Sequence, residues 1–182
     1  MAKLPIGWLD SHAKDLLEFI YASFQHRYKN GTVDEDDTPI GGEPSFEWEK
    51  HDWRYQDWFW GGEPFSGIIV VSWRESPARD WIECWTMTVQ GRLMPDLSEQ
   101  QITDTYKCLD EALKAAPQDC PYRGPEIYRS DERYIYSNGL NFARGLTGFS
   151  VERLTGVEFI DTMSEGRSYE CNYSAQVINV LY

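Results

Sequence analysis

An aromatic stretch in the first half of the chain holds the residues best suited to binding chemistry. Residues 53–67 read WRYQDWFWGGEPFSG and contain three of the eight tryptophans. Aromatic rings supply large apolar contact areas, and a few charged groups among them fix the orientation of a ligand. We therefore expect a small-molecule site made of Tyr55, Asp57, Trp58, Trp60, Glu63, Trp85 and Arg123.

Asp57 is the polar residue of this stretch that most needs a partner. In an extended strand it shares a face with Tyr55 and Phe59, and burying its carboxylate there is costly unless a cation or backbone amides compensate the charge. We predict Arg123 as that cation. A structural ion pair or turn cap is one reading of Asp57, and a carboxylate that orients a ligand is the other.

The alternation of the strand divides its aromatic side chains between two faces. Trp58 and Trp60 fall on one face, and Tyr55 and Phe59 fall on the other with Asp57. A sheet with one face on the core and one in water has no use for a second aromatic row unless something covers it. We expect the helices of the domain to cover one face and a ligand or partner to occupy the other.

Signatures of catalysis are weak in this sequence. His12 and His26 fall on or near the polar side of a predicted helix, where a surface role is usual, and His51 stands beside the aromatic stretch. Gly61-Gly62 lacks the following lysine and helix start of a phosphate loop. We predict no catalytic residue, metal ligand or cofactor.

A hydrolase acting on a sugar-like substrate remains an alternative, because paired acids beside aromatic rings cleave glycosidic bonds. The acids available are Glu47, Glu49, Asp52, Asp57 and Glu63.

The net charge of the chain favours some classes of binding partner and disfavours others. A formal net charge of -13 repels phosphate, so we expect no nucleic acid and no anionic membrane as partner, and a basic protein is favoured instead.

The four cysteines are widely spaced without a CxxC pair, which predicts free thiols. The sequence contains no apolar run long enough for a signal peptide or a membrane span, which predicts a soluble, cytoplasmic protein.

Two helices and a series of short strands should position these residues within one domain, 1–182. The first helix is predicted from a cap at Asp10 or Ser11 to Asn30, and the second from Ser98, with a capping box closed by Gln101, to Pro117. Residues 32–46 read as a mobile acidic loop. Strands are predicted at about 53–60, 66–73, 81–89, 127–129, 133–137, 148–153, 156–162, 168–174 and 177–181.

An internal echo indicates how the strands are arranged. Residues 65–71 (FSGIIVV) resemble residues 154–160 (LTGVEFI), and residues 85–91 (WTMTVQG) then align with 169–175 (YECNYSA). A second register, which matches Glu83-Cys84 with Glu170-Cys171, is left open. We expect an α+β fold in which two similar hairpin units form a largely antiparallel sheet or half-barrel packed with two helices.

Several short motifs follow one another along the chain: Tyr55-x-Asp57, Gly61-Gly62, Phe65-x-Gly67, Trp85-x-Met87, Gly91, Arg123-Gly124-Pro125 and Gly156-x-Glu158. Through these motifs the chain resembles a bacterial family known only as a domain of unknown function, over roughly residues 14–178. Members occur alone or behind Xre-type helix-turn-helix repressor domains. No segment of this sequence resembles a helix-turn-helix, so the resemblance implies a stand-alone sensing or binding domain. The family places an acid at the position of Ile69 and a tyrosine at that of Val89; here only the second hairpin keeps its acid, Glu158.

Three functions follow from these observations. The first is a non-catalytic domain that binds or senses a small molecule in an aromatic-lined concavity of its sheet. The second is an acidic interaction module, of the immunity or antitoxin type, that neutralises a basic protein. The third is the sugar hydrolase.

Overall fold

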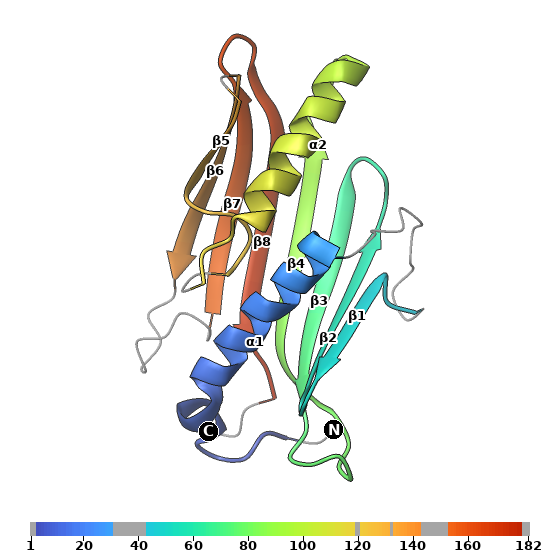
Figure 1. The fold of residues 1–182 in the computed structure, drawn as a ribbon, viewed down its shortest axis with the longest axis vertical. Coiled ribbons are helices and arrows are strands. Elements are labelled where there is room, and N and C mark those ends of the chain that lie inside the picture. The colour runs from blue at the N-terminus through green and yellow to red at the C-terminus, as the bar shows by residue number, and fades with distance from the viewer. Residues whose placement is uncertain (1–2, 31–42, 119–120, 132, 143–152, 180–182) are drawn as a thin grey trace.

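The structure is a computed structural model, and it describes residues 3–30, 43–118, 121–131, 133–142 and 153–179. One helix and four strands are followed by a second helix and four more strands. All eight strands form one open antiparallel sheet, and both helices lie across the same face of it (Figure 1). The α+β prediction is confirmed, and the sheet does not close into a barrel.

The element bounds agree with most of the predicted ranges. The helices are α1 (Trp8–Asn30) and α2 (Glu99–Lys114). The strands are β1 (Phe46–Lys50), β2 (Trp53–Trp60), β3 (Phe65–Trp73), β4 (Ile82–Leu93), β5 (Ile127–Ser130), β6 (Tyr134–Phe142), β7 (Arg153–Thr162) and β8 (Gly166–Val177).

The two halves of the chain lie side by side in the sheet and meet at the central strands β4 and β8. The sheet order is β1-β2-β3-β4-β8-β7-β6-β5, and each half is a helix followed by four antiparallel strands. Gly67 pairs with Val89 in the first half, as Gly156 pairs with Tyr173 in the second. The pairing agrees with the first register of the echo and excludes the second.

Helix α1 begins at Trp8, earlier than the predicted caps. Gly7 has a left-handed φ of 72°, and the amide of Trp8 donates to the carbonyl oxygen of Pro5 at 3.0 Å. The Ser11 hydroxyl is in reach of the Trp8 carbonyl oxygen at 3.0 Å and donates back into the first turn. Ser11 is therefore inside the helix, and the prediction of a cap at Asp10 or Ser11 is wrong.

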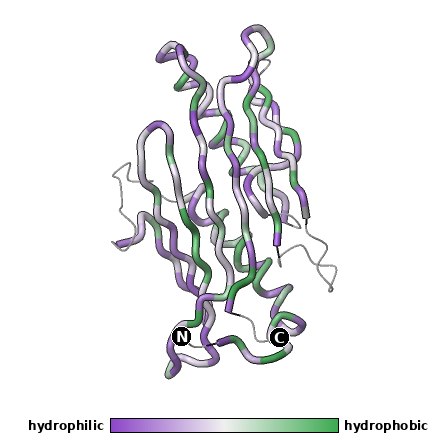
Figure 2. Tube along the Cα trace, turned by 180° about the vertical axis from the view of Figure 1, so that it is seen from behind, coloured by the Kyte–Doolittle hydropathy of each residue, from purple (hydrophilic) through white to green (hydrophobic). Residues whose placement is uncertain are grey.

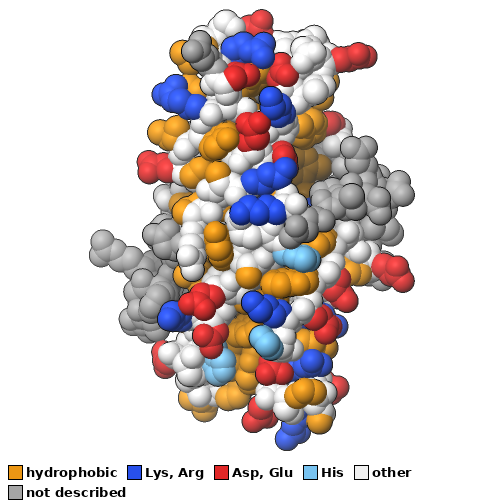
Figure 3. Space-filling model, in the orientation of Figure 1, with side chains coloured by type: hydrophobic (Ala, Val, Ile, Leu, Met, Phe, Trp, Pro, Cys, Tyr) orange, Lys and Arg blue, Asp and Glu red, His pale blue; other side chains and the backbone are white. Residues whose placement is uncertain are grey.

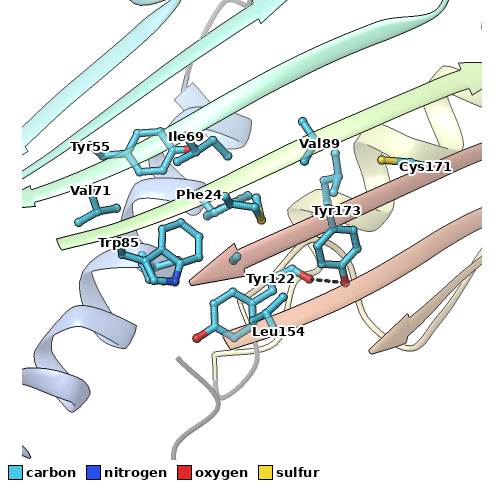
Figure 4. Packing of buried hydrophobic residues seen from close by; sticks show 14 of the residues in the cluster. Phe24, Tyr55, Ile69, Val71, Trp85, Val89, Tyr122, Leu154, Cys171 and Tyr173 are labelled. Atoms are coloured by element: carbon cyan, nitrogen blue, oxygen red, sulfur yellow. Dashed lines mark hydrogen bonds between the residues drawn. The ribbon is translucent and has the colours of Figure 1, made fainter. Parts of the chain in front are cut away.

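One stripe of α1 packs on the first half of the sheet. Leu16, Ile20 and Phe24 are fully buried, and each such burial stabilises the fold by about 1.5–3 kcal/mol. In Figure 4, Phe24 lies over the sheet beside Ile69. The same stripe continues to Arg27, whose side chain is buried as well.

Helix α2 confirms its predicted start. The Gln101 amide donates to the Ser98 hydroxyl at 3.3 Å, and the Ser98 amide donates to the Gln101 side chain at 2.7 Å. Tyr106 on this helix is exposed, because the helix turns another set of residues toward the sheet. That set is Thr105, Cys108, Leu109, Ala112 and Leu113.

One strand, β1, was not predicted from the sequence, and several predictions fall on residues that the structure does not describe. Strand β1 has the sequence FEWEK, and its charged, short form is typical of a protected sheet edge. Most of the predicted acidic loop, residues 31–42, lies outside the described residues, as do Cys120, nearly all of the strand predicted at 148–153, and residues 180–181 of the last predicted strand.

Cys84, Cys108 and Cys171 are buried free thiols, as predicted. Neither described helix combines the length and the apolar composition that a membrane span requires. The sheet face away from α1 and α2 carries no helix within the described ranges (Figure 2).

Candidate functional site

The predicted site residues are divided between two sides of the sheet. Tyr55, Asp57, Trp85 and Arg123 are buried between the sheet and its covering segments, with exposed fractions of 0%, 0%, 0% and 2%. In β2, Trp58 and Trp60 alternate with Tyr55 and Asp57. Both tryptophans therefore lie on the other face of the sheet, where they are half-buried. Glu63 is exposed in the β2–β3 turn. The structure does not bring these seven residues together into one site.

Asp57 pairs with Arg27 of α1, so the predicted partner Arg123 is wrong. The Arg27 Nη1 contacts Asp57 Oδ2, with the two side chains 4% and 0% exposed. The Tyr55 hydroxyl donates to the same oxygen at 3.4 Å, and the guanidinium lies 4.7 Å from the centroid of the Phe59 ring. Burial raises the pKa of Tyr55, although the charge of Arg27 opposes the shift. The hydroxyl therefore stays a donor.

Arg123 binds Glu158 of β7 in a second buried pair. Its Nε lies 3.0 Å from both carboxylate oxygens and its Nη2 lies 2.8 Å from Oε2. The Tyr136 hydroxyl donates to Glu158 Oε1 and accepts the Gly124 amide at 3.0 Å. Burial works against the charge of Arg123, but Glu158 together with Cys171 and nearby tyrosines raises the pKa of the guanidinium well above its usual value. The guanidinium of Arg123 thus stays charged at neutral pH.

Neighbouring polar side chains tie the segment after α2 to the sheet. The Tyr173 hydroxyl donates to Asn138 Oδ1 at 2.6 Å, and Asn138 Nδ2 donates to the carbonyl oxygen of Gly124 at 2.9 Å. Figure 4 shows Tyr122 between Trp85 and Tyr173, with its carbonyl oxygen facing the Tyr173 hydroxyl. These interactions hold the segment against the sheet.

The two buried pairs occupy related places in the two halves. Asp57 lies opposite Ile69, and Asn138 lies opposite Glu158, so Ile69 corresponds to Glu158 and Tyr55 to Tyr136. The first half thus carries its buried acid on β2, whereas the second half carries it on β7. The sequence contains a pattern that could have identified Arg27 as the partner of Asp57. Arg27 lies three positions after Phe24, on the same apolar stripe of α1.

Glu63 has a structural role between two elements. Its carboxylate accepts the Leu93 amide at 2.8 Å and the hydroxyl of Tyr106 on α2. Partial burial raises the pKa of Glu63, and the Leu93 amide opposes this shift. Glu63 therefore fastens the β2–β3 turn to β4 and α2.

A groove between α1 and the β1–β2 turn offers a different aromatic site. Its volume is about 520 Å³, within the range of small-molecule sites. Residues from one side of α1 form one wall, and the turn and the end of β3 form the other. The lining residues are His12, Asp15, Glu18, Phe19, Ala22, Lys50, His51, Asp52, Trp53, Trp73 and Glu75.

Three aromatic side chains line this groove and support one another. Trp53 and Trp73 are directly paired between β2 and β3, and both are half-buried. The Phe19 ring stacks on Trp53 with centroids 5.6 Å apart and an interplanar angle of 26°. Trp8 packs behind both tryptophans, 5.9 Å from Trp53 and 5.7 Å from Trp73. The packing fixes the rings, and their exposed parts face solvent in the groove.

The turn that closes the groove is held by Arg74. The Arg74 amide donates to the Asp52 carbonyl oxygen at 3.0 Å, and its Nη2 donates to the His51 carbonyl oxygen at 3.4 Å. His51 adopts a left-handed φ of 56° in this turn. The backbone contacts, more than the 3.8 Å ion pair between Arg74 and Asp52, fix the turn beside the end of β3.

The groove is acidic. Its lining contains the carboxylates of Asp15, Glu18, Asp52 and Glu75 and the single ammonium group of Lys50. Figure 3 shows acidic, histidine and hydrophobic side chains exposed together on the helix-covered face. Within the described residues, no group of three or more His, Cys, Asp or Glu side chains is placed to hold a metal ion. The groove therefore combines negative charge with aromatic surface.

A smaller groove, of about 320 Å³, lies on the open side of the sheet near the β2–β3 turn. The Arg92–Glu170 ion pair, 2.6 Å between Nη2 and Oε1, is part of its lining. Phe65 is the one aromatic residue in that lining, and its ring packs toward the core against Tyr169. This second groove lacks the aromatic walls that the sequence predicted for a ligand site.

Comparison with known proteins gives a family and no characterised relative. Neither the curated proteins nor the solved structures contain a match to this chain. A family model matches residues 57–178, which include β3–β8 and α2. Nine of the eleven groove residues, from His12 to Trp53, precede this segment, so the ligand of the groove must be argued from its own residues. The resemblance to a family of unknown function is confirmed, and the occurrence of other members behind helix-turn-helix domains stays an expectation about the family. The chain belongs to the family described as Domain of unknown function (DUF5680).

Proposed function

We propose that the protein binds a small organic cation in the groove between α1 and the β1–β2 turn. The supporting observation is that Trp53, Trp73 and Phe19 line the same groove as four carboxylates. This keeps the predicted function, small-molecule binding on aromatic surface, but assigns it to other tryptophans. Trp58, Trp60 and Trp85 are divided between the two faces of the sheet and do not form the walls.

The chemistry of the lining favours a cation over a neutral or anionic ligand. A cation over an exposed aromatic ring gains about 0.5–1 kcal/mol, and more when the site excludes water. The carboxylates add a longer-ranged attraction, in line with the formal net charge of -13. An anionic ligand would meet four carboxylates and one ammonium group. A small organic cation satisfies both features of the groove.

Isothermal titration calorimetry with a panel of soluble cations tests this proposal. The panel contains alkyl and aryl amines, guanidines, quaternary ammonium compounds and polyamines, each beside a neutral alcohol of similar shape. We expect cations to bind and their neutral counterparts to bind at least about tenfold more weakly, since one ion pair or cation–π contact is worth roughly 1 kcal/mol or more.

A pair of charge-matched variants locates the binding. Asp15→Asn with Glu18→Gln removes two charges from the groove, and Glu83→Gln with Glu126→Gln removes two exposed charges outside it. We expect the groove variant to weaken cation binding about tenfold and the control to change it less than about twofold. Binding by no member of the panel, or equal losses in both variants, would contradict the proposal.

The basic protein partner predicted from the charge differs in its salt dependence. Association with a basic surface is steered by many charges and weakens steeply as salt is added. Pull-downs from lysate at low and high salt would reveal such a partner. The small-molecule proposal predicts a gentler dependence, because aromatic contact is not screened.

A further inference from the structure

His12 is held in one orientation on the wall of the groove. Its ring stacks on Trp8 with centroids 4.9 Å apart and an interplanar angle of 6°, and its centroid lies 5.1 Å from that of Trp73, edge to face. Its Nδ1 lies 2.9 Å from the Trp8 carbonyl oxygen one turn earlier in α1. Contacts on three sides therefore fix the imidazole.

These contacts also decide which nitrogen carries the proton. A carbonyl oxygen can only accept, so Nδ1 must be the donor in the contact with Trp8. The Ser11 hydroxyl lies 2.9 Å from Nδ1 and 3.0 Å from the Trp8 carbonyl oxygen, to which it can donate its own proton. In the neutral ring Nε2 is then an unprotonated acceptor. No hydrogen bond from another described residue engages Nε2.

We infer that the groove selects cations that carry N–H donors, a primary ammonium or a guanidinium, over quaternary ammonium ions. This inference rests on the proposed function. A primary ammonium can donate to Nε2 of His12 while its charge interacts with Asp15 and with the faces of the tryptophans. A quaternary ammonium has no proton to donate, and it would bury the acceptor without a partner. His12 thus acts as a specificity-determining residue.

Two matched probes test the inference. Phenethylamine and its N,N,N-trimethyl derivative carry the same ring and the same charge, and they differ in N–H donors. We expect the wild-type protein to bind the primary amine about tenfold more tightly, as one hydrogen bond to a charged donor provides. In His12→Phe, which keeps an aromatic ring for stacking on Trp8, the preference should fall to within about twofold, with affinity for the trimethyl derivative unchanged. His26→Phe, which changes a histidine outside the groove lining, should keep the preference.

A spectroscopic measurement on the wild-type protein tests the inference even if His12→Phe fails to fold. The ¹⁵N shifts of labelled histidine report the tautomer of His12 and its hydrogen bonding. We expect the neutral ring to carry its proton on Nδ1, and we expect a change at Nε2 when phenethylamine, but not its trimethyl derivative, is added. Equal or tighter binding of the trimethyl derivative, a preference that survives in His12→Phe, or a proton on Nε2 of the free protein would overturn the inference. If neither probe nor any other cation binds, the proposed function itself fails, which is a separate result.

Discussion

The guanidinium of Arg27 on α1 closes on the carboxylate of Asp57 in β2, and at most 4% of either side chain is exposed. The pair joins the first helix to the aromatic strand on which the sequence concentrates its tryptophans. It also accounts for an acid in the middle of an apolar face, because the cation comes from the helix that covers that face. Arg123, far along the chain, has its own carboxylate in Glu158.

Breaking the buried pair should be costly. In Arg27→Leu the carboxylate of Asp57 stays buried without its cation, and we expect the free energy of unfolding in urea to fall by about 3–5 kcal/mol. Replacing both residues with leucine should recover much of this loss, because no buried charge then remains. The control is Lys14→Leu, which removes one partner of the exposed Lys14–Glu18 pair and should cost less than about 1 kcal/mol. Equal effects of the two single substitutions would contradict the burial argument.

The Tyr136 hydroxyl should matter more than that of a neighbouring tyrosine. Tyr136→Phe leaves Glu158 without one donor and the Gly124 amide without its acceptor, all in buried positions. We expect a loss of about 1–3 kcal/mol in the free energy of unfolding. Tyr128→Phe on edge strand β5 serves as the control, since Tyr128 is half-buried and its hydroxyl has no hydrogen bond among the described residues. This variant should stay within about 0.5 kcal/mol of wild type. If both changes cost the same, the network around Glu158 does not contribute as argued.

Gly156 is required by the ring that crosses it. A Cβ at this position would overlap the ring of Tyr173, and that ring cannot swing away freely because its hydroxyl is bonded to Asn138. We expect Gly156→Ala to lower the thermal midpoint and to cost about 1–3 kcal/mol. Gly139→Ala, on neighbouring β6, would meet only the Val157 carbonyl oxygen at 3.9 Å and should be tolerated. A harmless Gly156→Ala would show that Tyr173 can move.

Stability should fall as the pH rises above 9. Burial raises the pKa of the Cys108 and Cys171 thiols from 9.0 to about 11. Between these values the unfolded chain loses the thiol protons while the folded chain keeps them, so each thiol lowers the free energy of unfolding by about 1.4 kcal/mol per pH unit. Below pH 9 both states hold the protons and the effect vanishes.

Urea unfolding at several pH values measures this slope. Cys171→Ala should remove the share of one thiol between pH 9 and 11, and Cys108→Ala should do the same. The buried tyrosines Tyr136 and Tyr169, whose pKa values burial raises above 10, should add to the loss at the alkaline end. A wild-type stability that does not change above pH 9 would contradict the assigned burial of the thiols.

The sequence predicts local features well where the signal lies within a few residues. The capping box of Ser98 and Gln101 and the alternation in β2 depend on neighbours in the chain, and the structure agrees with both. The candidate site was harder to predict. Tyr55, Asp57, Trp58 and Trp60 form one continuous stretch, yet strand alternation and the position of α1 separate them into interior and open-face residues.

By itself, the sequence determined the fold class, most element positions, the acidic charge and the family resemblance, because periodicity, caps and composition are properties of the local chain. The tertiary structure decided the partners. Pairing of Asp57 with Arg27, of Arg123 with Glu158, and of His12 with the groove walls depends on which face of the sheet α1 covers. That choice is made by packing over the whole sheet, where burying an apolar stripe outweighs any pairwise preference written in a short segment.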